Sequence, residues 1–329
     1  MKFFYTIIAL LSTHCIAFSQ IKITTTTSVF ADLIKNIAGE KVQISTIIPV
    51  EESPHTYKLQ EKDKVLLNDA AIIFQNGLNY EPFLNDFLSK NNNTQKVVVL
   101  SEGVTPIPIP NTQNIKDPHA WMSIYNVLFY IHNIKKALCK IDVENTFFYE
   151  KNYDAYRAKL VHLEDSFFAS LNTLPMNQRV FIDEHKGLYY FARAYNLHYI
   201  TLNGIDDVEE KDALKRIRKI IREDSVEVIF TEKKINNEAF KALAKDFNAE
   251  LGETLYSDSV GDAESGILTY TAMLEHNTNA ILKGLMKKNT DVPKKTWWED
   301  RINKKILMLI ALIIIAIGAF LGYRGKKIQ

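Results

Sequence analysis

The sequence predicts an α/β protein of two lobes, each a mostly parallel sheet flanked by helices, joined by one long helix and followed by a C-terminal transmembrane helix. Three observations support this fold class. Short apolar segments alternate with amphipathic ones in both halves of the chain, which is typical of parallel sheets covered by helices. A helical pattern of aromatic and leucine residues runs between the halves, over residues 143–171. An uncharged apolar run covers residues 306–323.

The first lobe is assigned to residues 20–142. Ser28 is expected to cap its first helix and Gly39 to end that helix. A stiff connector with prolines at positions 106, 108 and 110 leads into the last helix of the lobe. The strands are expected at residues 22–26, 42–48, 70–74 and 97–100, and the helices at residues 28–37, 62–68, 81–89 and 123–140.

The linking helix is assigned to residues 143–174 and the second lobe to residues 175–288. At a rise of about 1.5 Å per residue, the helical pattern would span roughly 40 Å, the length of a small domain. The second lobe repeats the alternation without repeating the sequence of the first. Its strands are expected at residues 180–182, 198–202, 226–231 and 253–256, and its helices at residues 187–195, 207–223, 236–247 and 265–286.

The N-terminus, residues 1–19, has the pattern of a signal peptide. Lys2 precedes an apolar core, and Ala17 and Ser19 form a small-x-small cleavage site. Lipidation of Cys15 is the alternative. Either processing route predicts an exported protein at the periplasmic or extracellular face.

The C-terminus predicts an anchor in the cytoplasmic membrane. A polar linker at residues 289–305 contains two tryptophans, which favour a membrane interface. The apolar run at residues 306–323 is just long enough to cross a bilayer as a transmembrane helix. Residues 324–329 would form a cytoplasmic tail.

Composition excludes some classes of function. The 40 basic and 39 acidic residues give a net charge of +1, and no basic stripe with interleaved aromatics occurs, so no nucleic-acid binding is expected. Signal cleavage would leave Cys139 as the only cysteine, which excludes an internal disulfide. A monomer is expected.

Four residues stand out as candidate metal ligands. His55 lies in Glu-Ser-Pro-His-Thr-Tyr, His119 in Asp-Pro-His-Ala-Trp, and His185 soon after an apolar strand. Asp258 lies in Leu-Tyr-Ser-Asp-Ser. Taken singly, a histidine before a helix is more often a cap or surface residue. In open α/β sheets, however, ligands bind beyond the carboxyl ends of strands. Three imidazoles and one carboxylate form a complete ligand set for zinc or another first-row divalent metal.

Neighbouring residues suit such a site. Pro54 and Pro118 stiffen the backbone directly before two of the histidines. A ligand imidazole usually donates its second N–H to a carboxylate or carbonyl, and the candidates here are Asp117, Glu184 and Glu232. Trp121 has two interpretations, a wall that keeps water from the site or simple core packing.

These motifs resemble those of the solute-binding proteins of zinc and manganese ABC importers, a group that includes metal-binding surface adhesin lipoproteins. The resemblance covers residues 23–285. It rests on the following matches, in order along the chain: Pro-x-Glu-Glu-Ser-Pro-His-Thr-Tyr at residues 49–57; Asp69-Ala70, Asn76-Gly77 and Glu81; Asp117-Pro118-His119-Ala120-Trp121; Glu184-His185 with Tyr190-Phe191-Ala192 and Tyr195; and Tyr256-Ser257-Asp258 with Tyr270 and Met273-Leu274.

The resemblance implies a rigid linking helix with limited closure of the lobes on the metal. It also implies that His55, His119, His185 and Asp258 bind the metal and that the protein delivers it to a membrane permease driven by an ATPase. Four protein ligands leave no open position for an activated water, so no enzyme is expected. The alternatives are an exported zinc-dependent hydrolase and a surface adhesin with a structural metal.

The transported ion is expected to be Zn²⁺, with Mn²⁺ as the alternative. In the family, the third ligand is histidine in many zinc binders and glutamate in many manganese binders, and here it is His185. Three nitrogen ligands favour zinc over the harder manganese ion. Residues 105–116 lack the histidine-rich loop of many zinc members, and Glu184 lies next to the third position.

Overall fold

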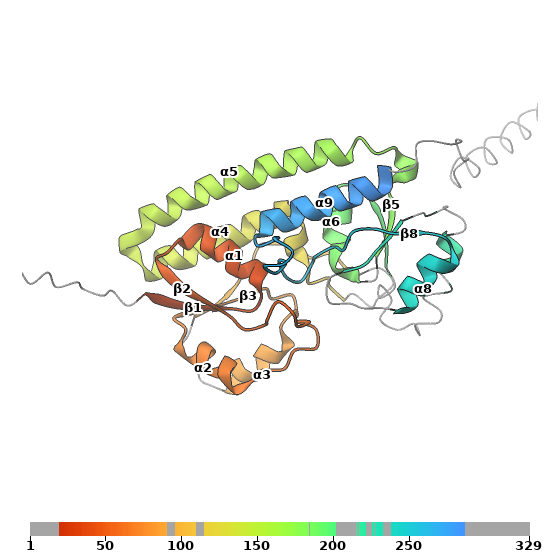
Figure 1. Ribbon diagram of the computed structural model, residues 1–329. Helices are drawn as coiled ribbons and strands as arrows, with labels where there is room; N and C mark the ends of the chain where they lie inside the picture. The colour runs from red at the N-terminus through yellow and green to blue at the C-terminus, as the bar shows by residue number, and fades with distance from the viewer. Residues whose placement is uncertain are drawn as a thin grey trace, which may run out of the picture.

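The structure, a computed structural model, describes residues 20–90, 96–109, 115–183, 185–201, 215, 217–221, 226, 228–232 and 238–286. Two four-stranded sheets form the centres of two lobes (Figure 1). Every strand pairing in both sheets is parallel. The two-lobe α/β part of the predicted fold class is confirmed.

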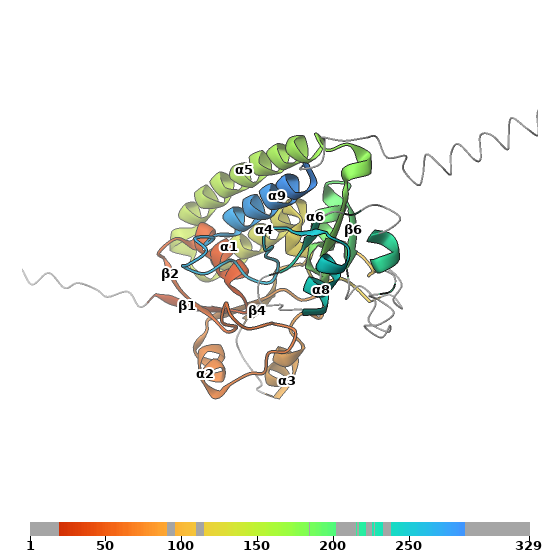
Figure 2. The same cartoon turned by 45° about the vertical axis from the view of Figure 1, so that its right-hand side comes forward.

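The first sheet has the strand order β2-β1-β3-β4. Helices α2 and α3 lie on one side of it, and α1 and α4 on the other (Figures 1 and 2). The elements of this lobe are β1 (Ile21–Thr25), α1 (Ser28–Ala38), β2 (Val42–Thr46), α2 (Glu61–Asp69), β3 (Ile72–Gln75), α3 (Pro82–Lys90), β4 (Lys96–Val99), η1 (Ala120–Met122) and α4 (Ile124–Ile141).

The second sheet has the order β6-β5-β7-β8, the same topology as the first. The two lobes therefore repeat one arrangement that the sequence does not reveal as a repeat. The remaining elements are η2 (Val143–Asn145), α5 (Thr146–Leu171), η3 (Met176–Gln178), β5 (Val180–Asp183), η4 (Lys186–Leu188), α6 (Tyr189–Ala194), β6 (His198–Thr201), β7 (Val228–Phe230), α8 (Glu238–Asp246), β8 (Glu250–Leu251) and α9 (Tyr270–Met286).

Helix α5 joins the lobes. Its 26 residues span about 39 Å, and it runs along both lobes beside α9 (Figures 1 and 2). It contacts α1 and α4 of the first lobe and α9 of the second. One cluster of buried side chains extends through both lobes, from Phe30 and Trp121 to Phe181 and Tyr270. A shared core of this kind resists large movements of one lobe against the other.

Two predictions in the second lobe are wrong. The expected strand at residues 253–256 is reduced to a single bridge between Glu232 and Leu255, and β8 lies earlier in the chain. The reason is that Asn277 of α9 bonds both backbone groups of Tyr256, accepting from its N–H at 3.0 Å and donating to its carbonyl at 2.6 Å. The last helix begins at Tyr270 instead of residue 265.

The predicted transmembrane helix at residues 306–323 requires a correction of the fold class. Over the residues that the structure describes, no helix has the length and apolar character needed to cross a bilayer. The long helices α4 and α5 carry charged side chains along their lengths, such as Lys136 and Asp154. The predicted transmembrane segment and the predicted signal peptide lie outside the described residues, as does most of the expected helix at residues 207–223. The lobe boundaries stay predictions.

Candidate metal centre

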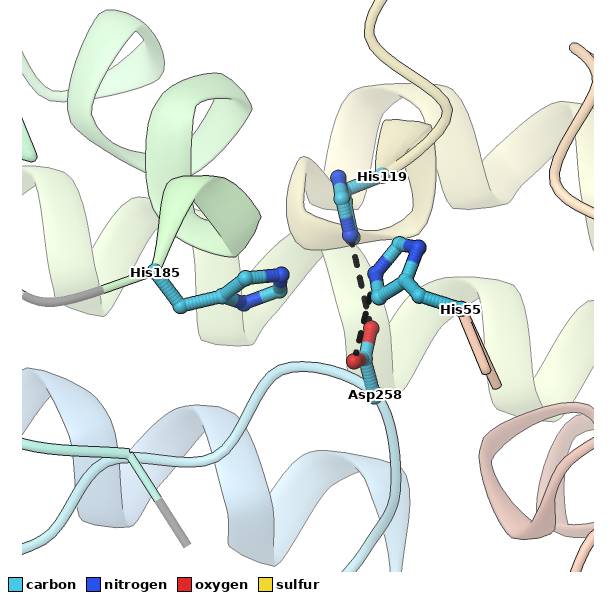
Figure 3. A group of neighbouring side chains, drawn as sticks. All are labelled: His55, His119, His185 and Asp258. Atoms are coloured by element: carbon cyan, nitrogen blue, oxygen red, sulfur yellow. Dashed lines mark ion pairs between the residues drawn. The ribbon is translucent and has the colours of Figure 1, made fainter. Parts of the chain in front are cut away.

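All four predicted ligand residues come together between the lobes (Figure 3). Each residue offers one ligand atom, and these atoms all lie within 4.8 Å of one another. His55 comes from the loop after β2, His119 directly precedes η1, and His185 precedes η4 after β5. Asp258 lies in the irregular segment before α9. Four segments that are remote in sequence therefore meet at one point.

Two distances within the group, each to a different oxygen of Asp258, are close to those around a small tetrahedral ion. Nε2 of His55 lies 3.5 Å from Oδ2 of Asp258, and Nε2 of His119 lies 3.4 Å from Oδ1. Two ligand atoms at about 2.1 Å from a tetrahedral zinc lie about 3.4 Å apart. The three imidazole rings are 5.2 to 5.4 Å apart between centroids. In Figure 3, Asp258 lies below the rings of His119 and His55, and His185 approaches from the side opposite His55.

His119 is completely buried and is oriented by Asp117. Its Nδ1 lies 2.7 Å from Oδ1 of Asp117, and its backbone N–H donates to the same oxygen at 2.9 Å. This contact keeps the proton on Nδ1 and directs the lone pair of Nε2 into the group. Nε2 has no hydrogen-bond partner within the described part of the chain. A buried nitrogen of this kind fits a metal ligand.

His185 is held in the same way by Glu232. Its Nδ1 lies 3.3 Å from Oε2 of Glu232 and 3.4 Å from the hydroxyl of Ser257. Ser257 also donates to Glu232, and the Tyr199 hydroxyl donates to the His185 carbonyl. A Cβ atom at Gly187 would lie 2.4 Å from the Ser257 hydroxyl, so a glycine is needed for this close packing.

Asp258 is 11% exposed and is held from the first lobe. The Tyr80 hydroxyl donates to its Oδ1 at 3.2 Å. The Trp121 indole donates to the carbonyl of Ser257 at 2.8 Å, and the Tyr270 hydroxyl donates to the Trp121 carbonyl at 2.6 Å. Trp121 is fully buried, with its ring 5.2 Å from that of His119. Both interpretations of Trp121 therefore apply, because it packs in the core and closes the site.

Tyr80 is brought to the group by an unusual turn after β3. Gly77, Leu78 and Asn79 have φ values of 81°, 53° and 61°, a left-handed conformation that is costly at leucine. The buried carboxylate of Glu81 stabilises the turn. It accepts hydrogen bonds from the backbone of Asn76 at 2.7 Å and Gly77 at 3.1 Å. Burial raises the pKa of Glu81 to about 7, although these donors act against the shift.

Asn76 and Tyr80 are functional residues that the sequence analysis missed. Asn76 donates to the carbonyl of Pro118 at 2.9 Å and so fixes the residue before His119. In the sequence, the pair Asn76-Gly77 stands out only as a match to the family. The signal for Tyr80 is its place directly before Glu81 and shortly after that pair. Glu184, one of the three predicted hydrogen-bond acceptors, lies outside the described residues.

Electrostatics differ strongly within the group. Burial lowers the pKa of His55 to about 4, against the attraction of Asp258. Burial also disfavours the charged form of His119, but Asp117 and Asp258 outweigh it and raise the pKa of His119 to about 10. The pKa of His185 is raised because Glu232 outweighs its burial. The three histidines overcome the burial of Asp258 and hold its pKa well below the usual range.

Two α/β lobes with parallel sheets, a shared core and one buried histidine cluster between them define a two-lobed binding protein. The chain belongs to the family described as Zinc-uptake complex component A periplasmic, whose family profile matches residues 23–284. Its sequence relatives include metal ABC transporter substrate-binding lipoproteins.

Sequence relatives support this membership. The metal ABC transporter substrate-binding lipoprotein SsaB of Streptococcus sanguinis is 32% identical over 279 residues, which cover 82% of this chain and 90% of that protein. The manganese ABC transporter substrate-binding lipoprotein ScaA of Streptococcus gordonii is 31% identical, with the same coverage. The relatives are transport proteins that bind substrates, so the chain is not an enzyme and the exported hydrolase is excluded.

Solved structures show the same architecture. The periplasmic zinc binding protein TroA from Treponema pallidum superposes with a TM-score of 0.76 at 26% identity, covering 81% of this chain and 99% of that chain. A Mn-bound periplasmic metal binding protein from Candidatus Liberibacter asiaticus gives a TM-score of 0.74 at 25% identity, covering 80% and 98%. The similar structures therefore include one of a zinc binding protein and one with manganese bound.

Proposed function

We propose that this protein captures one divalent metal ion through His55, His119, His185 and Asp258 and delivers it to the permease of an ABC importer. The observation that carries the proposal is the approach of four ligand atoms, from four separate segments, to within 4.8 Å of one another. The carboxylates behind His119 and His185 support it, because such partners orient ligand imidazoles and raise their basicity.

Zinc is the favoured ion, with manganese as the alternative. Three imidazole nitrogens and one carboxylate suit zinc, whereas manganese prefers more oxygen ligands. The spacing of 3.4 to 3.5 Å between the histidine nitrogens and Asp258 fits tetrahedral coordination. Because two of the relatives are named as manganese proteins, the titration described below includes manganese as well as zinc.

Export and membrane attachment are part of the proposal. Several relatives are named lipoproteins, which supports lipidation of Cys15, the alternative that the N-terminal sequence offers. Mass spectrometry of the mature N-terminus tests this. A free N-terminus at Gln20 would exclude the lipid.

A competition titration tests the metal assignment. The metal-stripped chain is titrated with zinc and with manganese against a chelator of known affinity. One tight site that prefers zinc is expected, and His119→Ala should weaken it strongly. His132→Ala is the matched control, since that histidine lies on α4 and packs against Tyr153 away from the group. Equal binding by the parent and His119→Ala would contradict the assignment.

Reloading separates transport from a structural metal. A transport protein stays folded when stripped of metal and binds it again, whereas a structural metal, as in an adhesin, leaves an unfolded chain when it is removed. Delivery is tested by metal uptake in cells that lack the chain. The parent should restore uptake and His119→Ala should not.

A further inference from the structure

Helix α1 has two polar side chains that accept backbone hydrogen bonds from the second lobe. Ser28 was expected to cap α1, but the N-cap residue is Thr27, and the Ser28 hydroxyl accepts a hydrogen bond from the backbone of Val260 at 3.1 Å. One turn further along, Oδ2 of Asp32 accepts from the backbone of Tyr270 at 2.9 Å. Residues four apart lie on one face of a helix, so both contacts are made by the same face of α1.

Both acceptors bind the segment that carries Asp258. This segment begins beside α9 at Tyr256, where the Asn277 side chain forms hydrogen bonds with the N–H and the carbonyl of Tyr256. It ends at Tyr270, the first residue of α9. Val260 is two residues after Asp258, and Tyr270 is the first residue of α9. The segment therefore belongs to the second lobe by sequence. It is hydrogen-bonded to the first lobe at Val260, close to Asp258, and again at Tyr270, where the segment ends.

We propose that Ser28 and Asp32 are positioning residues that latch the Asp258 segment to the first lobe and thereby slow the release of the bound metal. The proposal rests on the proposed function, because it assumes that Asp258 is a metal ligand. Release through this side of the site requires Asp258 to withdraw from His55 and His119. The segment resists withdrawal as long as its two backbone amides stay bonded to α1.

Charge makes the Asp32 contact the stronger of the two. Hydrogen bonds to a charged acceptor contribute more than neutral ones. Burial raises the pKa of Asp32, while the Tyr270 amide and the charge of Lys159 act against the shift. Lys159 of α5 also donates to the hydroxyl of Thr271 at 3.1 Å, so the linking helix supports the same end of the segment.

The test measures metal release from full-length protein. Zinc-loaded parent, Ser28→Ala, Asp32→Ala and the double variant are mixed with excess chelator, and the release rate is followed. The double variant should release zinc about tenfold faster than the parent, with each single variant intermediate. The association rate should change much less, because the latch does not contact His55, the most exposed ligand.

Conservative and control variants separate positioning from general stability. Ser28→Thr keeps the hydroxyl and should release zinc at nearly the parental rate. Asp32→Asn keeps an oxygen that accepts from Tyr270 but loses the charge, so its release rate should lie between those of the parent and Asp32→Ala. Lys35, which also lies on α1, forms an exposed ion pair with Glu40 beyond the end of the helix. Lys35→Ala removes this pair and should not change the release rate. The unfolding midpoint of the metal-free protein is measured for every variant.

The outcomes are distinguishable. A parent that binds neither zinc nor manganese contradicts the proposed function, whereas a parent that binds only manganese contradicts the zinc preference and is tested for release with that ion. A parent that binds, together with a folded double variant that releases at the parental rate, overturns the latch. Acceleration by Lys35→Ala to the same extent also overturns it. If the double variant does not fold, Ser28→Ala decides alone, and parental release from that variant counts against the proposal.

Discussion

The two sides of the group of four candidate ligands differ in burial and in the partners of their histidines. On the inner side, His119 and His185 are 0% and 8% exposed, and each has a carboxylate behind its Nδ1. On the outer side, His55 is 34% exposed, lies in a loop, and pairs with Asp258, itself a member of the group. The inner side is preorganised for a metal. The outer side is the part of the group most open to solvent, where an exchanging ion would enter.

This contrast predicts unequal losses when ligands are removed. Structural zinc sites bind with about 10 to 16 kcal/mol, so one of four ligands corresponds to about 2.5 to 4 kcal/mol, or roughly 100- to 1,000-fold in affinity. His119→Ala should show the full loss because it also leaves the buried Asp117 carboxylate without its imidazole partner. His55→Ala should lose only about tenfold, because water reaches its place at the exposed edge. Chelator competition measures both, and equal losses would contradict the comparison.

The two sides should also respond differently to pH. In the metal-free protein, the pKa of His119 is raised to about 10 and that of His185 is also raised, so both imidazoles are in the positively charged form near pH 6. A metal must displace both protons, so affinity should rise with pH, by up to about 100-fold per unit at the acid end. The slope falls towards about tenfold per unit once the pH passes the pKa of His185. His55, with its pKa lowered to about 4, is already neutral and adds nothing.

Affinity measured by chelator competition at pH 6, 7 and 8 tests this sign. Proton release is obtained independently from calorimetric titrations in buffers of different ionisation enthalpy. Affinity that does not change between pH 6 and 8 would mean that His119 and His185 are neutral in the metal-free protein.

Removing a carboxylate behind a ligand should weaken binding less than removing the ligand. Asp117→Asn replaces an anionic acceptor by a neutral one and should cost about 10- to 100-fold in metal affinity. It should also lower the pKa of His119 and reduce the pH slope by about one proton. Asp142→Asn is the control, since Asp142 accepts hydrogen bonds from Asn145 and Tyr149 at the start of α5. A parental slope in Asp117→Asn would contradict the role of Asp117.

The parallel sheets were predictable because their signal is local. Strands β1 and β3 are rich in apolar or β-branched residues, and amphipathic segments follow them. The strand expected at residues 253–256 is less apolar, and it does not form. Its backbone is bonded by Asn277, which is 21 residues away in sequence, and no local pattern reports such a contact.

The ligand residues were predictable for a similar reason. Each histidine stands in a distinctive motif, and the rule for the carboxyl ends of parallel strands correctly places His55 and His185 beyond β2 and β5, one in each lobe. The same rule was applied to Asp258 through the strand at residues 253–256, which does not form. The supporting contacts were less accessible. Tyr80 reaches Asp258 across 178 residues, and Ser28 was assigned to a cap because serine at a helix start is usually one. Sequence patterns identify the residues that do chemistry better than the residues that hold them.

The smallest predicted effect concerns Tyr80, which belongs to both sides of the group. Its ring lies 5.6 Å from that of His55 and 5.9 Å from that of His119, and its hydroxyl donates to Asp258. Tyr80→Phe keeps the ring packing and removes one hydrogen bond to a charged acceptor. A net loss of about 1 kcal/mol corresponds to about fivefold weaker metal binding. Tyr57→Phe, which removes a hydroxyl bonded to Asp63, is the control. A loss as large as that of His119→Ala would mean that the hydroxyl binds the metal directly, and the four-residue ligand set would then have to include Tyr80.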